Sequence, residues 1–316
     1  MSAFASSSRH SGFAALIGAP NVGKSTLFNR LVGARLSIVS PKPQTTRGRV
    51  LGVVTRSEGQ VALVDTPGLQ ASKGSLHRYL ARQAVHALSD ADLILFMIEP
   101  APRADQPIGE ENRFILDRLS RATKPSFLVI NKIDQVAKAR LLPLIESYQK
   151  RFAFEEAVPI SAKTGNGLAH LLKLVLARLP EGEPIFEAET LTDQAERGLA
   201  AEYIREQVLL HCRQEIPHSS AVTVESFDES EREPRPGDGG KPRAGLVRIH
   251  ATIHVERYSQ RAIVIGKHGS MLKKIGVGAR SSIEQLLGAH VYLSLYVRVE
   301  PRWSERPEAL KKLGYV

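Results

Sequence analysis

Gly18-Ala-Pro-Asn-Val-Gly-Lys-Ser25 is a glycine-rich stretch between an apolar run at 13–17 and a helical pattern that Gly33 ends. A strand, a glycine loop and a helix N-terminus in this order aim free backbone N–H groups at one point, which suits a phosphate. In such a loop the lysine reaches the β- and γ-phosphates, and the following hydroxyl binds Mg²⁺. The stretch therefore predicts a nucleoside-triphosphate site whose phosphate loop consists of Gly18, Ala19, Pro20, Asn21, Val22, Gly23, Lys24, Ser25 and Thr26.

A second apolar run, at 61–64, leads into Asp65-Thr-Pro-Gly-Leu69. A carboxylate in this place can hold Mg²⁺ through water, and the Gly68 amide can sense a γ-phosphate. Asp-Thr-Pro-Gly by itself is a common turn. Together with the phosphate loop, however, it predicts that the site also includes Asp65, Thr66, Pro67, Gly68 and Leu69.

Two further segments indicate which base is bound. The run at 127–130 leads into Asn131-Lys-Ile-Asp134, and the run at 158–160 leads into Ser161-Ala-Lys163. An ionised Asp134 only accepts hydrogen bonds, so it suits the N1–H and N2 amine of guanine and rejects adenine. Such a site discriminates between bases by roughly 10⁴ or more. We expect Lys132 to lie along the base, Asn131 to tie this loop to the phosphate loop, and the amides of the last segment to meet the guanine O6. The predicted ligand is GTP, and the base-side residues are Asn131, Lys132, Ile133, Asp134, Ser161, Ala162 and Lys163.

All four motifs follow apolar strands, and helical patterns alternate with them at 75–89, 110–121, 137–150 and 168–179. This alternation predicts an α/β fold with a doubly wound, mostly parallel sheet that binds its ligand at the carboxyl ends of the strands. Strands at 49–56 and 60–64 are expected to form a hairpin around Ser57-Glu-Gly59. A breaker-rich stretch at 180–184 predicts a linker, so we divide the chain into 1–180, a linker at 181–192, and 193–316, which ends in a C-terminal tail.

The last segment has a different pattern. We expect a helix at 193–211, strands at 221–227 and 246–256, two helices around Gly266-Lys-His-Gly269 with the second at 270–287, and a strand at 291–299. Residues 228–243 are expected to form a mobile loop, and His250 and His254 to be exposed strand residues. A glycine turn between two helices can pack against a sugar–phosphate backbone and clamp about four nucleotides. No platform for aromatic stacking is evident. The candidate RNA-binding residues are Ile265, Gly266, Lys267, His268, Gly269, Lys273 and Lys274.

Charge agrees with an anionic partner. The net charge is +10, and residues 244–316 carry 12 Lys and Arg against 5 Asp and Glu. Such an excess attracts nucleic acid or an anionic membrane surface. The one cysteine cannot form an internal disulfide, residues 1–12 lack a signal-peptide pattern, and the apolar run at 93–98 is too short to span a bilayer. We therefore expect a cytoplasmic protein.

The quoted motifs, with Gln44-Thr-Thr-Arg47, resemble the Era family of bacterial GTPases over nearly the whole chain. The resemblance implies a GTPase domain joined to an α+β KH domain of the bacterial arrangement. It also implies that the chain binds GTP and GDP, contacts small-subunit ribosomal RNA near its 3′ end, and assists maturation of the 30S subunit.

The expected chemistry is GTP hydrolysis with Mg²⁺ held by Ser25, Thr46 and Asp65, and Lys24, Thr46 and Gly68 as the catalytic groups. We favour Thr46 over Thr45 as the metal ligand. Leu69 stands where many small GTPases carry a glutamine, so unassisted hydrolysis is expected to be slow. An asparagine matching Asn21 helps hold K⁺ in related GTPases, which suggests a second cation. GTP is expected to order residues 41–49 and 69–74.

Three alternatives remain at this point. A GTPase that serves RNA modification would need a further catalytic site, and none is evident. A structural RNA-binding protein with a vestigial nucleotide site is disfavoured by the intact Lys24, Ser25, Asp65 and Asp134. A membrane-signalling GTPase, peripheral on the inner face of the membrane, would use the same basic excess.

Overall fold

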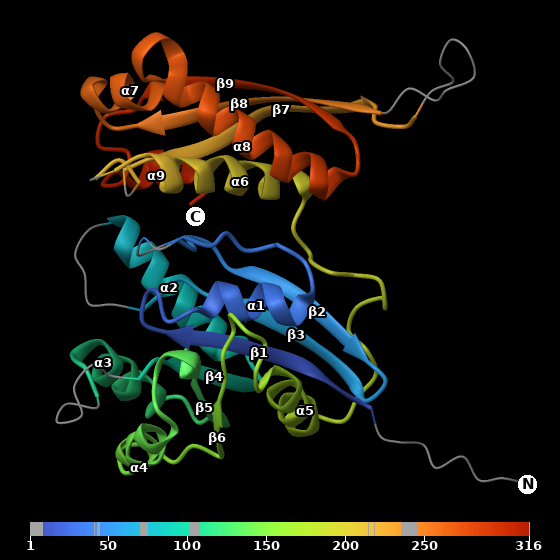
Figure 1. The fold of residues 1–316 in the computed structure, drawn as a ribbon, viewed down its shortest axis with the longest axis vertical. Helices are drawn as coiled ribbons and strands as arrows, with labels where there is room; N and C mark the ends of the chain where they lie inside the picture. The colour runs from blue at the N-terminus through green and yellow to red at the C-terminus, as the bar shows by residue number, and fades with distance from the viewer. Residues whose placement is uncertain are drawn as a thin grey trace, which may run out of the picture. The chain divides into compact units, whose positions relative to one another are not determined.

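The computed structural model describes residues 9–40, 42, 45–69, 75–100, 108–213, 215–217, 219–234 and 245–315. The chain divides into two compact units, one made mainly of residues up to Asp193 and the other of residues from Gln194 onward (Figure 1). Parts of three expected features lie outside the described residues. They are Gln44, positions 41, 43 and 70–74 of the segments expected to be ordered by GTP, and residues 235–243 of the expected loop.

The first unit is built on a six-stranded sheet of order β2-β3-β1-β4-β5-β6. All neighbouring strands are parallel except β2 and β3, which form the expected antiparallel hairpin. This confirms the predicted doubly wound sheet. The strands are β1 (His10–Gly18), β2 (Val50–Arg56), β3 (Gly59–Asp65), β4 (Leu93–Ile98), β5 (Ser126–Ile130) and β6 (Glu156–Pro159).

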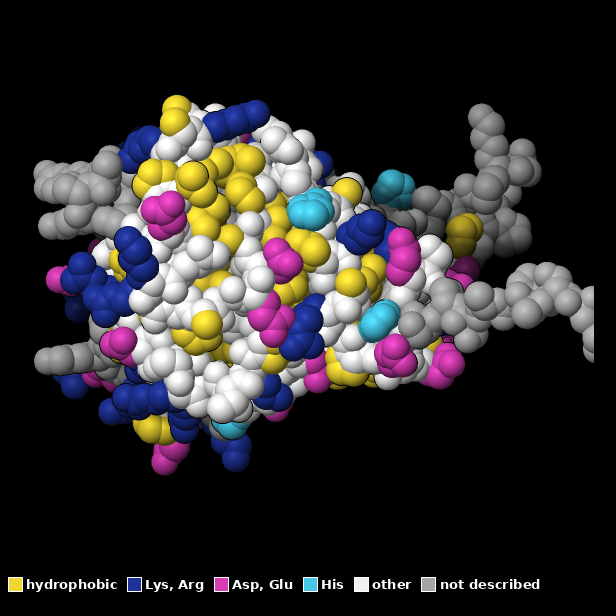
Figure 2. All heavy atoms as spheres, turned by 90° about the horizontal axis from the view of Figure 1, so that it is seen from below, with side chains coloured by type: hydrophobic (Ala, Val, Ile, Leu, Met, Phe, Trp, Pro, Cys, Tyr) yellow, Lys and Arg dark blue, Asp and Glu magenta, His cyan; other side chains and the backbone are white. Residues whose placement is uncertain are grey.

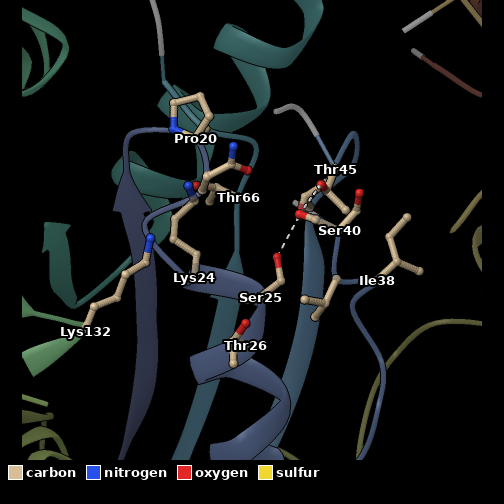
Figure 3. A pocket seen from close by; sticks show the side chains of 14 residues that line it. Pro20, Lys24, Ser25, Thr26, Ile38, Ser40, Thr45, Thr66 and Lys132 are labelled. Atoms are coloured by element: carbon tan, nitrogen blue, oxygen red, sulfur yellow. Dashed lines mark hydrogen bonds between the residues drawn. The ribbon is translucent and has the colours of Figure 1, made fainter. Parts of the chain in front are cut away.

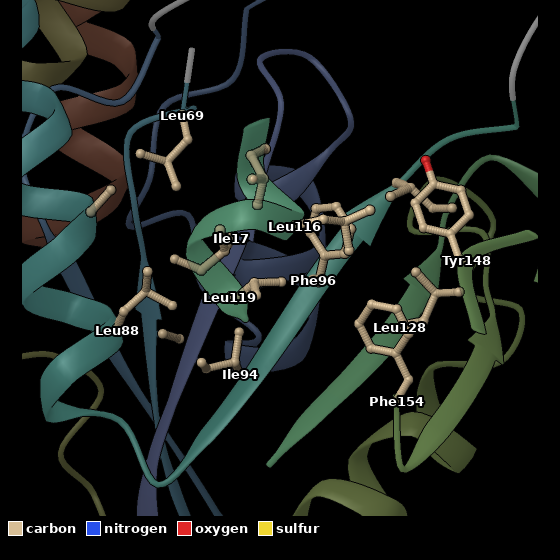
Figure 4. Packing of buried hydrophobic residues seen from close by; sticks show 14 of the residues in the cluster. Ile17, Leu69, Leu88, Ile94, Phe96, Leu116, Leu119, Leu128, Tyr148 and Phe154 are labelled. Carbon is tan, nitrogen blue, oxygen red and sulfur yellow. The ribbon is translucent and has the colours of Figure 1, made fainter. Parts of the chain in front are cut away.

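Helices cover both faces of this sheet. α1 (Lys24–Val32) and α5 (Leu168–Arg178) contact β1 and β3. On the opposite face, apolar side chains of α2 (Ser75–Asp90), α3 (Glu110–Leu119) and α4 (Leu141–Gln149) form one buried cluster with β1, β4 and β5 (Figure 4). This core holds the strand ends, and therefore the motifs that follow them, in fixed positions.

The helix expected over 137–150 is shorter in the structure. A 3₁₀ turn, η2 (Lys138–Arg140), comes first, and α4 starts only at Leu141. The reason is Pro143, which has no N–H to donate and fits an α-helix only in its first turn. A second 3₁₀ turn, η1 (Ile133–Gln135), follows β5 and carries Asp134.

The second unit has a three-stranded sheet of order β7-β8-β9, in which β8 and β9 are parallel. Figure 1 shows α6 and α8 on one face of it. The order helix, two strands, two helices and strand is the one predicted. The elements are α6 (Glu196–His211), β7 (Ala221–Glu231), β8 (Leu246–Val255), α7 (Tyr258–Ile265), η4 (Lys267–Gly269), α8 (Ser270–Leu287) and β9 (His290–Val299).

Strand β7 runs beyond its predicted end. Residues 228–231, expected to begin a mobile loop, continue to pair with β8 after register shifts. Asp228 lies opposite Arg248, and Arg248 forms an ion pair with Glu231. These cross-strand charges stabilise polar positions that, from the sequence, indicate a loop.

The segment after β9 is folded, although the sequence indicates only a C-terminal tail. Trp303 is completely buried, donates from Nε1 to the Ser219 carbonyl at 2.8 Å, and stacks on Tyr315. A short helix, α9 (Pro307–Lys312), follows with its proline in the first turn. One aromatic anchor thus adds this segment to the core of the second unit.

The expectation that His254 is exposed is wrong. Only 3% of it is exposed, and its Nε2 lies 2.8 Å from the Thr223 hydroxyl. His254 is therefore a buried strand residue. Among the described residues, no group of three His, Cys, Asp or Glu could hold a metal.

The surface of the first unit seen in Figure 2 mixes charges of both signs with apolar patches. Within the described parts of the chain, no helix combines the length and apolarity needed to cross a bilayer.

Candidate functional site

The phosphate loop begins where β1 ends. Gly18 lies so close to β4 that a Cβ there would be 2.4 Å from the Met97 carbonyl oxygen. Asn21 and Gly23 have left-handed backbones, with φ of 63° and 103°. Because Gly23 caps α1 in this conformation, Lys24 and Ser25 start the helix and reach from it into the pocket (Figure 3).

Lys24 is buried and held inside the loop. Its Nζ donates to the carbonyl oxygens of Gly18 at 3.0 Å and Ala19 at 2.9 Å. Burial lowers the pKa of Lys24 to about 8, although the carboxylates of Asp65 and Glu111 attract the charged form. The loop therefore positions an ammonium group where phosphate oxygens would arrive.

Three oxygen-bearing side chains converge beside it. The Ser25 Oγ donates to Asp65 Oδ2 at 2.8 Å, and the Thr46 hydroxyl donates to the same oxygen at 3.1 Å. The two hydroxyls are 3.0 Å apart. The other carboxylate oxygen, Oδ1, is buried without a hydrogen-bonding partner among the described residues. An all-oxygen set with an unsatisfied carboxylate oxygen fits Mg²⁺.

Thr45 also lines the pocket, but its hydroxyl donates to the Lys42 carbonyl at 2.7 Å. This geometry favours Thr46 as the metal ligand. Burial raises the pKa of Asp65, while Lys24 and hydrogen bonds from Ser37, Ser25 and Thr46 oppose that rise.

Ser37 is a site residue that the sequence analysis missed. It is buried, and its Oγ donates to Asp65 Oδ2 at 2.7 Å. Asn29 of α1 holds this segment by accepting from the Leu36 and Ser37 amides and donating to the Ser37 carbonyl. No sequence pattern could identify Ser37, because it belongs to none of the four motifs and only the fold brings it to Asp65.

The Asp65–Leu69 segment forms another part of the pocket wall through Thr66 and Gly68. Thr66 donates to the Leu16 carbonyl at 2.7 Å, and the Leu69 amide to the Gly18 carbonyl at 3.3 Å. A Cβ on Gly68 would be 2.9 Å from the Pro20 nitrogen, so this segment and the phosphate loop touch. Pro67 connects Thr66 and Gly68. The Leu69 side chain lies in the core (Figure 4) and offers no polar atom to the site.

The base-side loops are joined through Asn131. Its Nδ2 donates to the Val22 carbonyl at 2.8 Å, and its Oδ1 accepts from the Ala162 amide at 2.9 Å. The expected tie to the phosphate loop is therefore present. A Cβ on Gly23 would be 2.2 Å from Nδ2, so only glycine leaves room for this clamp.

Asp134 and Lys132 follow β5, and each contacts a residue of another segment. Asp134 lies in η1 beside Ile133 and accepts from the Ser161 hydroxyl at 2.6 Å. Lys132 has a left-handed backbone and forms an ion pair with Glu99. The Lys163 carbonyl accepts from Arg30 of α1 at 2.6 Å, which attaches this loop to the phosphate-loop helix.

A pocket of about 300 Å³ lies at the phosphate end. Most of its wall comes from the phosphate loop, from residues 38–40, and from Thr45, Thr46, Thr66 and Gly68, with Lys132 on the other side (Figure 3). Thr26, which follows Ser25 in α1, is part of the same wall. Five separate chain segments thus meet at one pocket.

The glycine turn of the second unit joins α7 to α8 after Ile265. Gly266 and Gly269 have φ of 73° and 77°, and His268 between them has φ of 51°. A Cβ on Gly266 would be 2.7 Å from that of Met271. Lys267 and His268 are exposed at the turn.

An open groove of about 400 Å³ runs beside this turn between α8 and β9. Lys273 is among the residues that line it, whereas Lys274 is exposed but not among them. The sequence analysis missed Arg280 and Tyr292, which also line the groove. Apolar walls with a basic margin suit RNA bases and their phosphates.

Known proteins share both units. Residues 13–132 match the family described as 50S ribosome-binding GTPase, and residues 215–304 match the KH domain family. GTPase Era of Geobacter metallireducens is 48% identical, with 96% of this chain and 97% of that protein covered. The chain belongs to the Era family of GTPases.

Other Era proteins agree. GTPase Era of Syntrophus aciditrophicus is 43% identical over 96% of this chain and 95% of that protein. A solved Aquifex aeolicus Era bound to GDP and aluminium fluoride is 40% identical, with a TM-score of 0.87 and coverage of 97% of this chain and 99% of that one. An Era complex with MgGDPNP and nucleotides 1506–1542 of 16S ribosomal RNA is 41% identical, with a TM-score of 0.88 and coverage of 98% and 99%. The predicted family and its GTPase activity are thereby confirmed, and the MgGDPNP in the solved Era complex supports Mg²⁺ as the cofactor.

Proposed function

We propose that this chain is a GTP-hydrolysing switch that binds small-subunit ribosomal RNA through its KH unit and assists maturation of the 30S subunit. The observation that carries the nucleotide part is the convergence of Ser25, Thr46 and Asp65 beside Lys24. The RNA part rests on the glycine turn, its groove, and the Era relative solved with 16S ribosomal RNA.

Hydrolysis of GTP depends on positioning and charge neutralisation more than on covalent chemistry. Lys24 and the loop amides would balance the charge on the β- and γ-phosphates. Ser25, Thr46 and Asp65 would hold Mg²⁺, which supplies further positive charge when bound. The Gly68 amide would face the γ-phosphate from its place against Pro20. Since Leu69 cannot orient water, we expect slow turnover without a partner.

The purine would be selected at Asp134, which accepts from the two guanine donors. Asn131 would act by positioning, because it binds the phosphate loop and the Ser161–Lys163 segment together. Ser161 would hold the Asp134 carboxylate in place.

Calorimetry and hydrolysis assays test this function. We expect GTP to bind with Mg²⁺ and ATP to bind at least 10³-fold more weakly, because adenine leaves Asp134 unpaired. Lys24→Ala should abolish hydrolysis, whereas Lys138→Ala, a change outside the pocket, should not. Equal affinity for ATP and GTP, or hydrolysis that survives Lys24→Ala, would contradict the proposal.

The RNA ligand is tested by crosslinking in cells and mapping the bound RNA. Reads should gather on small-subunit ribosomal RNA. Reads gathered on transfer RNA would favour the modification GTPase instead.

We also propose that K⁺ assists hydrolysis, with Asn21 as the residue that helps hold it. The motivation is the family resemblance at Asn21 together with the apolar Leu69. Rates should be higher in K⁺ than in Na⁺, and Asn21→Ala should remove the difference. Equal rates in both salts, also unchanged in Asn21→Ala, would exclude this role.

We place the protein in the cytoplasm. Weak association with the inner membrane face is a second candidate, because residues 244–316 carry 12 basic against 5 acidic side chains. Flotation with anionic vesicles, compared with RNA capture by the same protein, decides whether the basic unit binds a membrane surface or RNA.

A further inference from the structure

The second unit exposes aromatic side chains on strand β9 and at the start of α7. Tyr292 and Tyr296 of β9 are 55% and 60% exposed, and Tyr258 at the start of α7 is 76% exposed. The side chains of Tyr292 and Tyr296 share one face of β9, since alternate residues of a strand point the same way. Large exposed aromatics gathered in one place are typical of a binding surface.

Two of these tyrosines line a pocket of about 650 Å³, here called the tyrosine pocket. Its wall includes Tyr258 and Arg261 of α7, Tyr296 and Arg298 of β9, Thr252 of β8 and Glu225 of β7. None of these residues lines the groove beside the glycine turn. The tyrosine pocket is therefore a separate site.

The two sites are nevertheless connected along β9. Tyr292 lines the groove and Tyr296 lines the tyrosine pocket. Four strand residues span about 13 Å. A single strand of RNA that leaves the groove past Tyr292 can therefore reach Tyr296 within a few nucleotides.

The charges of the tyrosine pocket suit a nucleotide. Arg261 is exposed and is fixed by a hydrogen bond from Nε to the Val297 carbonyl at 3.2 Å. Arg298 is exposed, and its positive charge acts on Glu225 and His254. Both guanidinium groups are available to a phosphate, and arginine binds phosphate well.

Glu225 sets a limit on what the pocket accepts. A hydrogen bond from Thr223 at 2.8 Å, as the largest cause, lowers the pKa of Glu225 and keeps it ionised. The carboxylate repels a phosphate at that margin but can accept from the exocyclic amine of a base. The pocket thus offers aromatic rings, one carboxylate and two guanidinium groups, with the charge of Arg298 acting on Glu225.

We propose that the tyrosine pocket is a second RNA contact, in which a base of single-stranded RNA stacks on Tyr258 and Tyr296 while Arg261 and Arg298 bind its phosphate. It extends the RNA path beyond the glycine-turn groove and rests on the proposed RNA-binding function. Stacking on aromatic side chains tolerates any base, because every base has a π-face.

The test uses the full-length protein and two fluorescent RNAs. One is the 16S fragment 1506–1542 present in the solved Era complex. The other is a four-nucleotide RNA, long enough for the groove only. The double variant Tyr258→Ala/Tyr296→Ala should bind the fragment about tenfold more weakly and the short RNA unchanged. The matched control Tyr258→Phe/Tyr296→Phe should keep both affinities, because phenylalanine also stacks.

Two further readouts keep the result unambiguous. Fluorescence of Trp303 and GTP hydrolysis should be the same in both double variants, which shows that the units remain folded. Irradiation should crosslink the fragment to peptides containing Tyr258 or Tyr296 in the wild type.

Unchanged binding of the fragment to the alanine variant would overturn the proposal, and so would equal loss in the phenylalanine control. Loss of binding to purified ribosomal proteins, with RNA binding intact, would assign the face to a protein and overturn it too. Failure of the wild type to bind either RNA would instead contradict the proposed function itself.

Discussion

Burial sets the ionisation of single residues in both units. Lys24 and Asp65 lie buried in the same pocket, where burial lowers the pKa of the lysine and raises that of the carboxylate. Each therefore depends on the other, and on a bound anion or cation, to stay charged. The binding of nucleotide and of metal should accordingly be coupled to the uptake or release of protons.

Lys24 makes the affinity for GTP depend on pH. Before binding its pKa is about 8, and neighbouring phosphates raise it, so binding is strongest below pH 8 and requires proton uptake above it. We expect affinity to fall about tenfold per pH unit above 8, since one pKa unit corresponds to a factor of ten. Calorimetry in two buffers of different ionisation enthalpy measures the uptake. Lys24→Arg, which stays charged, should show no uptake if it still binds.

His254 makes the stability of the KH unit depend on pH. Burial, opposed by Glu225 and Glu300, lowers the pKa of His254 in the folded state. The unfolded chain then binds more protons below pH 6.5, so the free energy of unfolding should fall as the pH drops below that value. Urea titrations followed by Trp303 fluorescence should show this slope, and His254→Gln should flatten it. The same change at the partly exposed His250 is the control, and an equal slope in both variants would refute the assignment.

At the scale of elements, the segment after β9 packs against the core of the KH unit. Trp303 is completely buried and donates to the Ser219 carbonyl, so α9 depends on it for its place. Trp303→Ala should lower the free energy of unfolding of the KH unit by about 3–5 kcal/mol, the usual cost of removing a buried aromatic ring. Far-UV circular dichroism in urea measures this loss. Lys311→Ala, on the exposed side of α9, should cost less than about 0.5 kcal/mol.

At the scale of the whole molecule, two compact units should respond to different ligands. Trp303 is the one tryptophan and lies in the second unit, so its fluorescence reports that unit alone. GDP with Mg²⁺ at about 100 times its Kd should stabilise the first unit by about 2.7 kcal/mol. The far-UV transition should therefore move while the Trp303 transition stays. A common shift of both transitions would show that the units unfold together.

The order of the four motifs, the doubly wound sheet and the helix–turn–helix with two glycines follow from the sequence by itself. These features depend on local chemistry, since glycine loops, acceptor-only carboxylates and apolar strands are legible as short patterns at fixed spacing. The contact of Ser37 with Asp65, the burial of His254 and Trp303, and the exposed tyrosines on β9 were decided only by the tertiary structure. Each depends on which distant side chains the packing brings together, and a hydroxyl, an imidazole or an aromatic ring looks the same in the sequence whether it ends up buried or exposed.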